Sequence, residues 1–311
     1  TMPNWAGSSW YFLRYLDPAN TDTFADPGKM KHWMPIDWYN GGMEHTTLHL
    51  LYSRFWNKFL FDIGAVPVSE PYMKRTSHGL VLGKGGEKMS KSRGNVVNPD
   101  VVVLGFGADA LRIYEMFMGP FDQAIPCDER GFSGASRFLG RVWALQTKIK
   151  GEGSGIENKD VIRVMHQTIK KVTEDIGEMR FNTAISTLMV YANALGEQEV
   201  VSKESYGMLL ILLAPFAPHI TEELWQLVGN DNSIHAEKWP SYDSKRIIEE
   251  RVILVVQVNG KTRDSLEVVK DTTKESAVEI ASKRERVILH IQGKEIVRVV
   301  YIQDRLINFV V

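Results

Sequence analysis

The sequence is poor in cysteine and has no long apolar run, and both absences narrow its class. Its 311 residues include a single cysteine, Cys127, which excludes an internal disulfide framework and an all-cysteine zinc site within the chain. One cysteine fits a reducing cytoplasm. No apolar stretch reaches the ~20 residues of a membrane span, and the first residues lack the pattern of a signal peptide. We therefore expect a cytoplasmic protein with no membrane partner.

An excess of charge of either sign is also absent. The formal net charge is -1, with 44% hydrophobic and 24% charged residues, as in an ordinary globular protein. Such a chain is no general polyanion binder, so any contact with nucleic acid must use local basic patches. A chain of this length predicts two or three domains.

The first region, residues 1–127, alternates short apolar runs with helical segments. Residues 35–40 and 78–82 predict strands, while 44–63 and 107–118 predict helices. This alternation is typical of an α/β domain with a parallel sheet.

Two further regions follow, 128–245 and 246–311. The first has helical spacing throughout and predicts a bundle, most simply an antiparallel one. In the second, Asn259-Gly260 follows a β run and is a strong hairpin signal, because both residues accept the positive φ of a tight turn. We expect a small α+β domain there, with a helix over 273–284. The predicted fold is therefore multidomain: α/β, then all-α, then α+β.

The most specific motif is the run Lys88-Met89-Ser90-Lys91-Ser92. Two ammonium groups on a glycine-flanked loop suit a pyrophosphate leaving group, and the hydroxyls of Ser90 and Ser92 can supplement them. The alternative is an ordinary solvated Lys/Ser loop. A longer context argues against it, and this context comprises Gly86, Glu87, Arg93, Gly94, Asn95, Pro99, Gly107, Ala108, Asp109 and Arg112.

A second cluster lies where a predicted strand meets a helix, in Gly41-Gly42-Met43-Glu44-His45 and His49. Two histidines four apart on one helix share a face. Such a pair can bind a metal, yet Thr46 stands where zinc proteases need glutamate, so no metal is expected. Core or capping histidines are the ordinary alternative. The Glu44 carboxylate can accept hydrogen bonds from two ribose hydroxyls.

The loop resembles the second signature of class I aminoacyl-tRNA synthetases. The stretches around Glu44 and over 5–15 resemble leucyl-tRNA synthetases, and the likeness extends over essentially the whole chain. The resemblance implies that residues 1–127 are the second half of a Rossmann-type catalytic domain. It implies that the loop stabilises the transition state in which an amino-acid carboxylate attacks the α-phosphate of ATP. Lys91 is then the first phosphate contact and Lys88 the second, with Ser90 and Ser92 beside them. Mg²⁺ would bridge the phosphates.

The resemblance also assigns the substrate pocket. The residues that it implies for ATP and the adenylate are Gly41, Gly42, Glu44, Val81, Leu82 and Lys91, with the backbone of Val81 and Leu82 reading adenine. The residues that it implies for the leucine side chain are Trp5, Ser8, Tyr11, His45 and His49. An aromatic-rich run such as 5–15 is otherwise more often core than pocket.

The resemblance also implies that the other two regions bind transfer RNA. Residues 213–225 resemble the anticodon-binding-type bundle of the leucine, isoleucine and valine enzymes, and 256–263 resemble the C-terminal domain of bacterial leucyl enzymes. Lys261 and Arg263 are candidate phosphate contacts, although two cations in a hairpin serve solubility equally well.

The sequence has no His-x-Gly-His signature, which in this family binds ATP from the other side. We expect the chain to be a leucine–tRNA ligase fragment or subunit, inactive alone, with leucine, ATP, the leucine tRNA and the missing N-terminal half as partners. The alternatives are a non-catalytic tRNA-binding module and a synthetase for isoleucine or valine.

Overall fold

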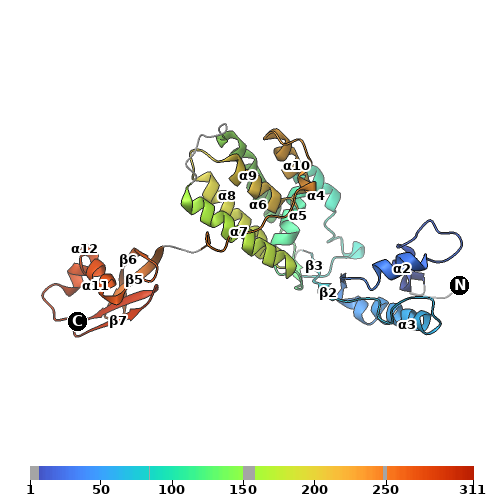
Figure 1. The fold of residues 1–311 in the computed structure, drawn as a ribbon, viewed down its shortest axis with the longest axis horizontal. Coiled ribbons are helices and arrows are strands. Elements are labelled where there is room, and N and C mark those ends of the chain that lie inside the picture. Colours follow the sequence, from blue (N-terminus) through green and yellow to red (C-terminus); the bar gives the residue numbers. More distant parts are fainter. Residues whose placement is uncertain (1–6, 84, 150–157, 248–250) are drawn as a thin grey trace. The chain divides into compact units, whose positions relative to one another are not determined.

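The computed structural model describes residues 7–83, 85–149, 158–247 and 251–311, whose path is shown in Figure 1. The chain divides into two compact units, and each is composed of two stretches of sequence. The first unit comprises Thr1–Gly155 with Thr168–Pro240, and the second comprises Ile156–Gln167 with Ser241–Val311. The multidomain class, with α/β, helical and mixed parts, is confirmed. The three domain limits expected from sequence stay a prediction.

Two short helices open the described chain, α1 (Tyr11–Arg14) and α2 (Pro27–Trp33). Asp26 caps α2, because its side chain accepts the backbone N–H of Lys29, and proline follows at the first helical position, where no N–H is needed. The helices pack around one apolar cluster, whose buried members are Phe12, Leu13, Ala25, Met30, Met34 and Val66.

A parallel strand pair follows, connected by a helix. Strand β1 (Tyr39–Gly42) pairs in parallel with β2 (Arg75–His78), and α3 (His49–Asp62) lies between them in sequence. The parallel α/β arrangement predicted from sequence is therefore confirmed for this region. The strand expected over 35–40 was placed too early, because Ile36 forms only an isolated bridge.

A second parallel pair joins β3 (Val81–Leu82) to β4 (Ile125–Pro126). The prediction of a single strand over 78–82 is wrong, because the strand is interrupted at Gly79. Its N–H donates to the carbonyl of Phe121 at 2.8 Å, and a Cβ there would collide with the carbonyl of Gln123. Only glycine permits this close backbone approach.

The segment between β3 and β4 contains the predicted loop and then two helices, α4 (Pro99–Phe106) and α5 (Ala108–Phe117). The Asn98 side chain caps α4 by accepting the backbone N–H of Asp100 at 2.9 Å. Gly107 separates the helices at φ 90°, a value that favours glycine. Helix α5 agrees closely with the helix expected over 107–118.

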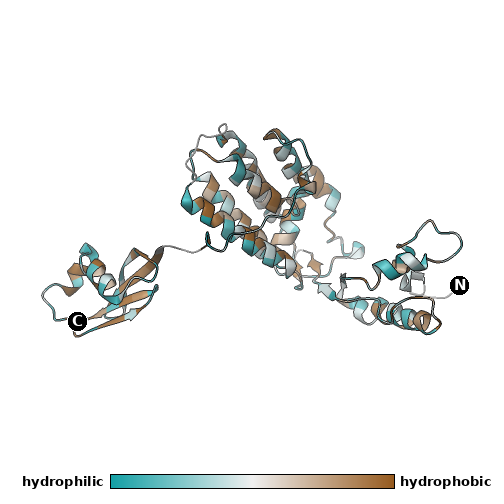
Figure 2. Cartoon of the chain, viewed as in Figure 1, coloured by the Kyte–Doolittle hydropathy of each residue, from teal (hydrophilic) through white to brown (hydrophobic). Residues whose placement is uncertain are grey.

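The helical region was predicted well by its periodicity. Its helices are α6 (Arg130–Leu145), α7 (Lys159–Gly177), α8 (Phe181–Gly196), α9 (Lys203–Leu213) and α10 (Pro218–Leu227). Figure 2 shows hydrophobic residues alternating with hydrophilic ones along these helices. Large side chains fill the interior, among them Phe138, Leu188, Tyr191, Tyr206 and Phe216. Two buried hydroxyls are satisfied by carbonyls, because Tyr191 donates to Ser205 and Tyr206 to Val142.

Helix α5 is fastened to the bundle by two charged side chains. The Asp109 carboxylate accepts the N–H of Ile220 at 2.7 Å and lies 2.8 Å from Nδ1 of His219. It therefore caps α10 from another helix. Arg112 donates to the carbonyls of Pro215 and Phe216 at 2.8 and 3.1 Å. These contacts explain two residues of the sequence motif that follows the loop.

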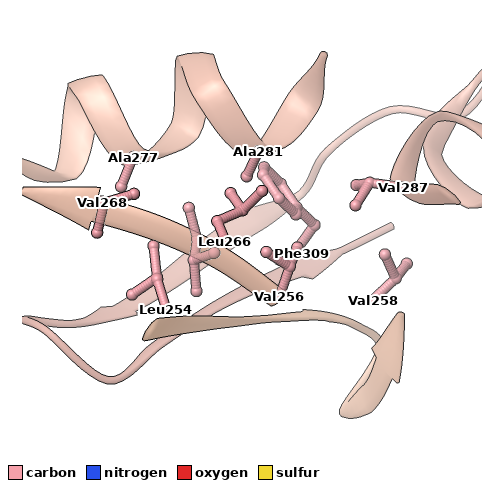
Figure 3. Packing of buried hydrophobic residues seen from close by; sticks show 10 residues of the cluster. Leu254, Val256, Val258, Leu266, Val268, Ala277, Ala281, Val287 and Phe309 are labelled. Carbon is pink, nitrogen blue, oxygen red and sulfur yellow. The ribbon is translucent and has the colours of Figure 1, made fainter. Parts of the chain in front are cut away.

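The C-terminal sheet has the order β6-β5-β8-β7. Its strands are β5 (Arg251–Val258), β6 (Lys261–Val269), β7 (Arg298–Ile302) and β8 (Leu306–Val310), and its helices are α11 (Lys274–Ser282) and α12 (Glu285–Ile291). Figure 3 shows Leu254, Val256 and Phe309 meeting Ala277 and Ala281 of α11 in one core. The hairpin prediction is confirmed, with Asn259 at φ 50° and Gly260 at φ 76°. Sequence periodicity did not reveal α12.

None of the helices in the described ranges is long and apolar enough to cross a membrane.

Candidate active site

A hydrogen-bonded aromatic cluster forms around His49. The Nε2 atom of His49 lies 2.6 Å from the hydroxyl of Tyr39, which also meets the hydroxyl of Tyr11. The His49 ring stacks on Tyr11 and Tyr39, with centroids 5.5 and 5.7 Å away. Tyr72 stacks on Tyr39 at 4.2 Å and donates to Ser53 at 2.9 Å. The structure thus brings together two of the residues predicted for the leucine pocket.

Burial sets the protonation of this cluster. It lowers the pKa of His49, and the nearby His45 lowers it further, so the His49 ring is neutral at pH 7. Burial and the hydrogen bond with Tyr11 raise the pKa of Tyr39, and burial raises that of Tyr72 to about 12. The cluster is therefore an uncharged, mostly aromatic wall, which suits an apolar side chain better than a charged one.

The two histidines do not share one continuous helix as the sequence suggested. His45 lies in a 3-10 turn over Met43–Thr46, and His49 begins α3. Leu48 between them has φ -112° and ψ -99°, which breaks the helical path. The rings nevertheless meet edge to face, with centroids 6.5 Å apart. The prediction that the two histidines lie close together is confirmed, but the continuous helix predicted to carry both is wrong.

Glu44 folds back over the end of β1. A Cβ on Gly42 would collide with the Glu44 carboxylate, so glycine at this position leaves room for that side chain. A backbone hydrogen bond lowers the pKa of Glu44, as do the charges of His45, Lys88 and His78. Glu44 is thus ionised and lies within the electrostatic reach of the loop lysine.

Asn95 holds the described part of the loop from Lys88 to Ser90. The Asn95 side chain accepts the N–H of Ser90 at 2.9 Å and donates to the carbonyl of Lys88 at 3.3 Å. The hydroxyls of Ser90 and Ser92 lie 2.8 Å apart. Gly94 adopts φ 64° just after the 3-10 turn Lys91–Arg93. The Asn95 side chain therefore clamps the backbone at Lys88 and Ser90.

The loop cations Lys88, Lys91 and Arg93 differ in whether they are paired. Lys88 and Lys91 are exposed, and no ion pair or hydrogen bond within the described ranges holds either ammonium group. Arg93 is paired instead with Glu87 at 3.1 Å. Both lysines are consequently available to an anionic ligand.

The predicted adenine strand lies beside the loop. Leu82 pairs with β4 and forms an antiparallel bridge with Lys88. A cavity of about 320 Å³ opens next to Val81, and its other lining residues include His78, Glu115, Phe121 and Phe181. Burial raises the pKa of Glu115. This volume lies within the range of small-molecule pockets.

The remaining predicted residues are dispersed. Ser8 is half-buried in the 3-10 turn Gly7–Ser9, which packs against α3 and so lies near the aromatic cluster. Trp5 lies outside the described residues. Lys261 is exposed and Arg263 is half-buried on β6, in the second unit. Asn259 bonds to both backbone groups of Val311, which fastens this hairpin to the end of the chain.

Two family models match the chain. Residues 15–127 match the class I tRNA synthetases for isoleucine, leucine, methionine and valine, and residues 158–279 match the anticodon-binding domain of tRNA ligases. Among solved structures, the chain is similar to the Agrobacterium radiobacter LeuRS in a ternary complex with tRNA and LeuAMS. The identity is 35% and the TM-score 0.75, over 97% of this chain and 42% of that one.

The chain belongs to the class I aminoacyl-tRNA synthetases. The Mycobacterium tuberculosis methionyl-tRNA synthetase with methionyl-adenylate shares the fold, with a TM-score of 0.53 at 15% identity. That match covers 75% of this chain and 55% of the methionyl enzyme. The chain thus spans about half or less of the length of these two solved chains.

Two aromatic residues of the site were missed by the sequence analysis. Tyr39 is the direct partner of His49, and Tyr72 stacks behind it. They lie 10 and 23 residues from His49 in the sequence, on opposite sides of α3. The sequence offered one signal for Tyr39. It lies three residues before Gly42, the glycine that makes room for Glu44.

His45 and His49 belong to no metal-binding cluster within the described residues. Within the part of the chain that the structure describes, no group of three or more His, Cys, Asp or Glu side chains is arranged to hold a metal ion. A divalent ion carried by nucleotide phosphates needs no such group, because the phosphates and water supply most of its ligands.

Proposed function

We propose that this class I synthetase chain is part of a leucine–tRNA ligase, which activates leucine with ATP and transfers it to the leucine tRNA. One observation carries the proposal: the neutral Tyr11–Tyr39–His49 wall includes the first residue of β1, and the ionised Glu44, which feels the charge of Lys88, follows the carboxyl end of that short strand. Ligands of open α/β sheets bind at the carboxyl ends of strands. The 35% identity to a LeuRS supports leucine as the amino acid.

The aromatic wall would bind the leucine side chain. The hydroxyls of Tyr11 and Tyr39 and the Nε2 atom of His49 are hydrogen-bonded to one another. A hydroxyl or charge on the amino acid would therefore be buried without a partner here, which disfavours polar side chains. Aliphatic competitors are discriminated only by shape, at about 1–3 kcal/mol.

Glu44 and the loop would hold the nucleotide. The Glu44 carboxylate accepts hydrogen bonds from ribose hydroxyls, and the backbone of Val81 and Leu82 reads adenine. When the leucine carboxylate attacks the α-phosphate, the bond to pyrophosphate breaks and negative charge grows on the leaving group. Lys91 and Lys88 stabilise that charge, with Ser90 and Ser92 as further donors. Mg²⁺ brought by ATP would share this charge.

In the second step a terminal ribose hydroxyl of tRNA attacks the leucyl carbonyl, and AMP leaves. The match to the anticodon-binding domain supports tRNA as the partner of the helical region. Lys261 at the hairpin is exposed, as a phosphate contact must be. Arg263 is the second proposed contact.

The test uses a complete catalytic domain. Residues 1–311 replace the matched part of the Agrobacterium radiobacter LeuRS chain, and ATP–pyrophosphate exchange is measured with leucine, isoleucine, valine and methionine. Leucine should support the fastest exchange by at least tenfold. Faster exchange with another amino acid would refute the leucine assignment, and no exchange with any of the four would refute the ligase.

A matched pair of variants tests the loop in the same chimera. Lys91→Ala should slow exchange ~10²–10³-fold, as removal of one group that stabilises the transition state does. Lys31→Ala removes another exposed lysine, on α2, and should leave the rate unchanged.

A further inference from the structure

Four side chains of the first unit form a closed chain of contacts beside the proposed leucine pocket. Helix α3 carries two of them, His49 and Ser53, one turn apart. The hydroxyl of Tyr72 donates to Oγ of Ser53 at 2.9 Å, and the Tyr72 ring stacks on that of Tyr39 at 4.2 Å. The hydroxyl of Tyr39 lies 2.6 Å from Nε2 of His49. The contacts thus leave α3 at Ser53 and return to it at His49.

The bond between Tyr72 and Ser53 has a defined direction. Ser53 is completely buried, and its hydroxyl donates to the carbonyl of Leu50 at 3.4 Å. The Ser53 oxygen is left to accept, so the Tyr72 hydroxyl is the donor. Burial raises the pKa of Tyr72 to about 12, so this hydroxyl keeps its proton at pH 7. The bond therefore holds the end of the Tyr72 side chain against α3.

The backbone on both sides of Tyr72 is held as well. Ile36 donates its N–H to the carbonyl of Pro71 at 2.8 Å, and its carbonyl accepts the N–H of Met73 at 2.9 Å. The Tyr72 ring also contacts that of Phe12, with centroids 5.5 Å apart. Rotation of the side chain is the freedom that remains to Tyr72, and the bond to Ser53 restricts it.

Tyr39 is the member of this chain of contacts that belongs to the pocket wall. Its hydroxyl meets both Tyr11 and His49, and such bonds weaken steeply when donor and acceptor are misaligned. The Tyr72 ring lies nearly parallel to the Tyr39 ring, at 28°, and so supports it. A tilt of Tyr72 would let Tyr39 follow and move away from His49. Because similar aliphatic side chains are distinguished by shape, a small shift of this wall changes their fit.

We propose that Tyr72, held by Ser53, is a positioning residue of the amino-acid pocket, which fixes Tyr39 against His49 and thereby sets the shape of the wall that meets an aliphatic side chain. Tyr72 acts through Tyr39 and not on the substrate. The inference rests on the proposed function for the identity of the substrate, whereas the placement of Tyr39 and His49 can be measured without it. A purely structural Tyr72 would affect stability and leave amino-acid recognition unchanged.

Nuclear magnetic resonance of the 311-residue chain tests the placement directly. Burial and the nearby His45 lower the pKa of His49. Tyr72→Leu removes the stacked ring, so Tyr39 should loosen, water should reach His49, and its pKa should rise toward the ordinary value of about 6.5. The His49 signal is assigned by its absence in His49→Gln. Tyr242→Phe, at a 42% exposed side chain of the second unit, is the control and should leave this pKa unchanged.

Kinetics of the chimera test the hydroxyl group alone. Tyr72→Phe keeps the ring and Ser53→Ala keeps the helix, so both variants retain the packing around the bond. Each should raise the KM for leucine about threefold, as loss of one hydrogen bond does, while kcat stays within about twofold. Because both variants remove the same bond, the double variant should have no larger effect than Ser53→Ala alone. Tyr242→Phe should alter neither constant.

Each contrary result overturns the proposal. An unchanged His49 pKa in Tyr72→Leu would show that Tyr72 does not position the cluster. Additive effects of Tyr72→Phe and Ser53→Ala, or a loss of stability in urea with an unchanged KM, would reduce both residues to packing. Should Tyr72→Leu not fold, the titration is made on Tyr72→Phe, where the pKa of His49 should rise by less. Absence of that rise then counts equally against the proposal.

The two measurements also separate this inference from the proposed function. A raised His49 pKa in Tyr72→Leu, without leucine-dependent exchange by any chimera, would leave the positioning role standing and refute the ligase. Leucine-dependent exchange, with the pKa of His49 and the KM for leucine both unchanged by the variants, would do the reverse.

Discussion

Removing the Asp109 carboxylate should destabilise the first unit substantially. This side chain is almost completely buried and accepts the N–H groups of His219 and Ile220, besides meeting Nδ1 of His219 at 2.8 Å. Loss of a helix cap costs about 0.5–2 kcal/mol, and loss of a hydrogen bond to a charged group about 1.5–3 kcal/mol. Because the two losses overlap at one site, we expect Asp109→Ala to lower the free energy of unfolding by about 2–4 kcal/mol.

Urea unfolding followed by tryptophan fluorescence measures this loss, and Trp225 on α10 reports on the capped helix. Asp122→Ala removes an exposed carboxylate of the same unit and should change stability by less than about 0.5 kcal/mol. Hydrogen exchange of the Ile220 amide should accelerate in Asp109→Ala alone. If Asp109→Ala unfolds within about 0.5 kcal/mol of wild type, the carboxylate does not hold α10 and the reasoning fails.

Four further predictions concern the site and the partners. Lys91→Ala in the chimera should lower kcat for adenylate formation while leaving the KM for leucine nearly unchanged, since the charge acts on the transition state; a change confined to KM would contradict the role. Tyr39→Phe should raise the KM for leucine about 3–10-fold, because His49 loses one hydrogen bond worth about 0.5–1.5 kcal/mol; unaltered kinetics would remove Tyr39 from the site. The pKa of His49 is lowered by burial, so the unfolded chain binds this proton more readily and stability should fall as the pH drops below 6.5. Urea titrations from pH 5 to 8 check this, and His49→Gln should flatten the profile. Lys261→Ala with Arg263→Ala should weaken tRNA binding and reduce its salt dependence, by a slope of about 1 for each phosphate that no longer meets a cation; filter binding over a salt series decides, and an unchanged slope would make both residues mere surface charge.

Local chemistry predicted the regular elements of this chain. Asn259-Gly260 specified its hairpin because few residues accept a positive φ at both turn positions. Periodicity located the bundle helices because each buries one apolar stripe. The run from Thr273 to Ile291 was harder, since α11 and α12 adjoin at Lys283 and Arg284 without a glycine or proline to mark the boundary.

Long-range contacts lay beyond sequence reasoning. Asp109 and His219 are 110 residues apart, and nothing in either local sequence indicates the other. Tyr39 meets His49, and Tyr72 stacks on Tyr39, only because β1, α3 and β2 form a crossover that brings these rings together. The break at Leu48 has a similar origin, because propensity favours a continuous helix there and tertiary packing decides otherwise.

The roles proposed for the individual loop and pocket residues rest on their motif, and the structure adds a physical reason for its spacing. Gly42 leaves room for Glu44, and Asn95 clamps Ser90 to the loop backbone. We expect Asn95→Ala to free the loop. It should then lower the exchange rate of the chimera less than Lys91→Ala does, because the lysine itself remains.

The most direct test of the account is the amino-acid dependence of ATP–pyrophosphate exchange, measured on the chimera and on the 311-residue chain alone. The account predicts leucine-dependent exchange by the chimera, at least tenfold faster than with isoleucine, valine or methionine, and none by the isolated chain. Exchange by the chain alone would show that these 311 residues contain a complete activating site. A preference of the chimera for another amino acid would contradict the leucine pocket built around His49.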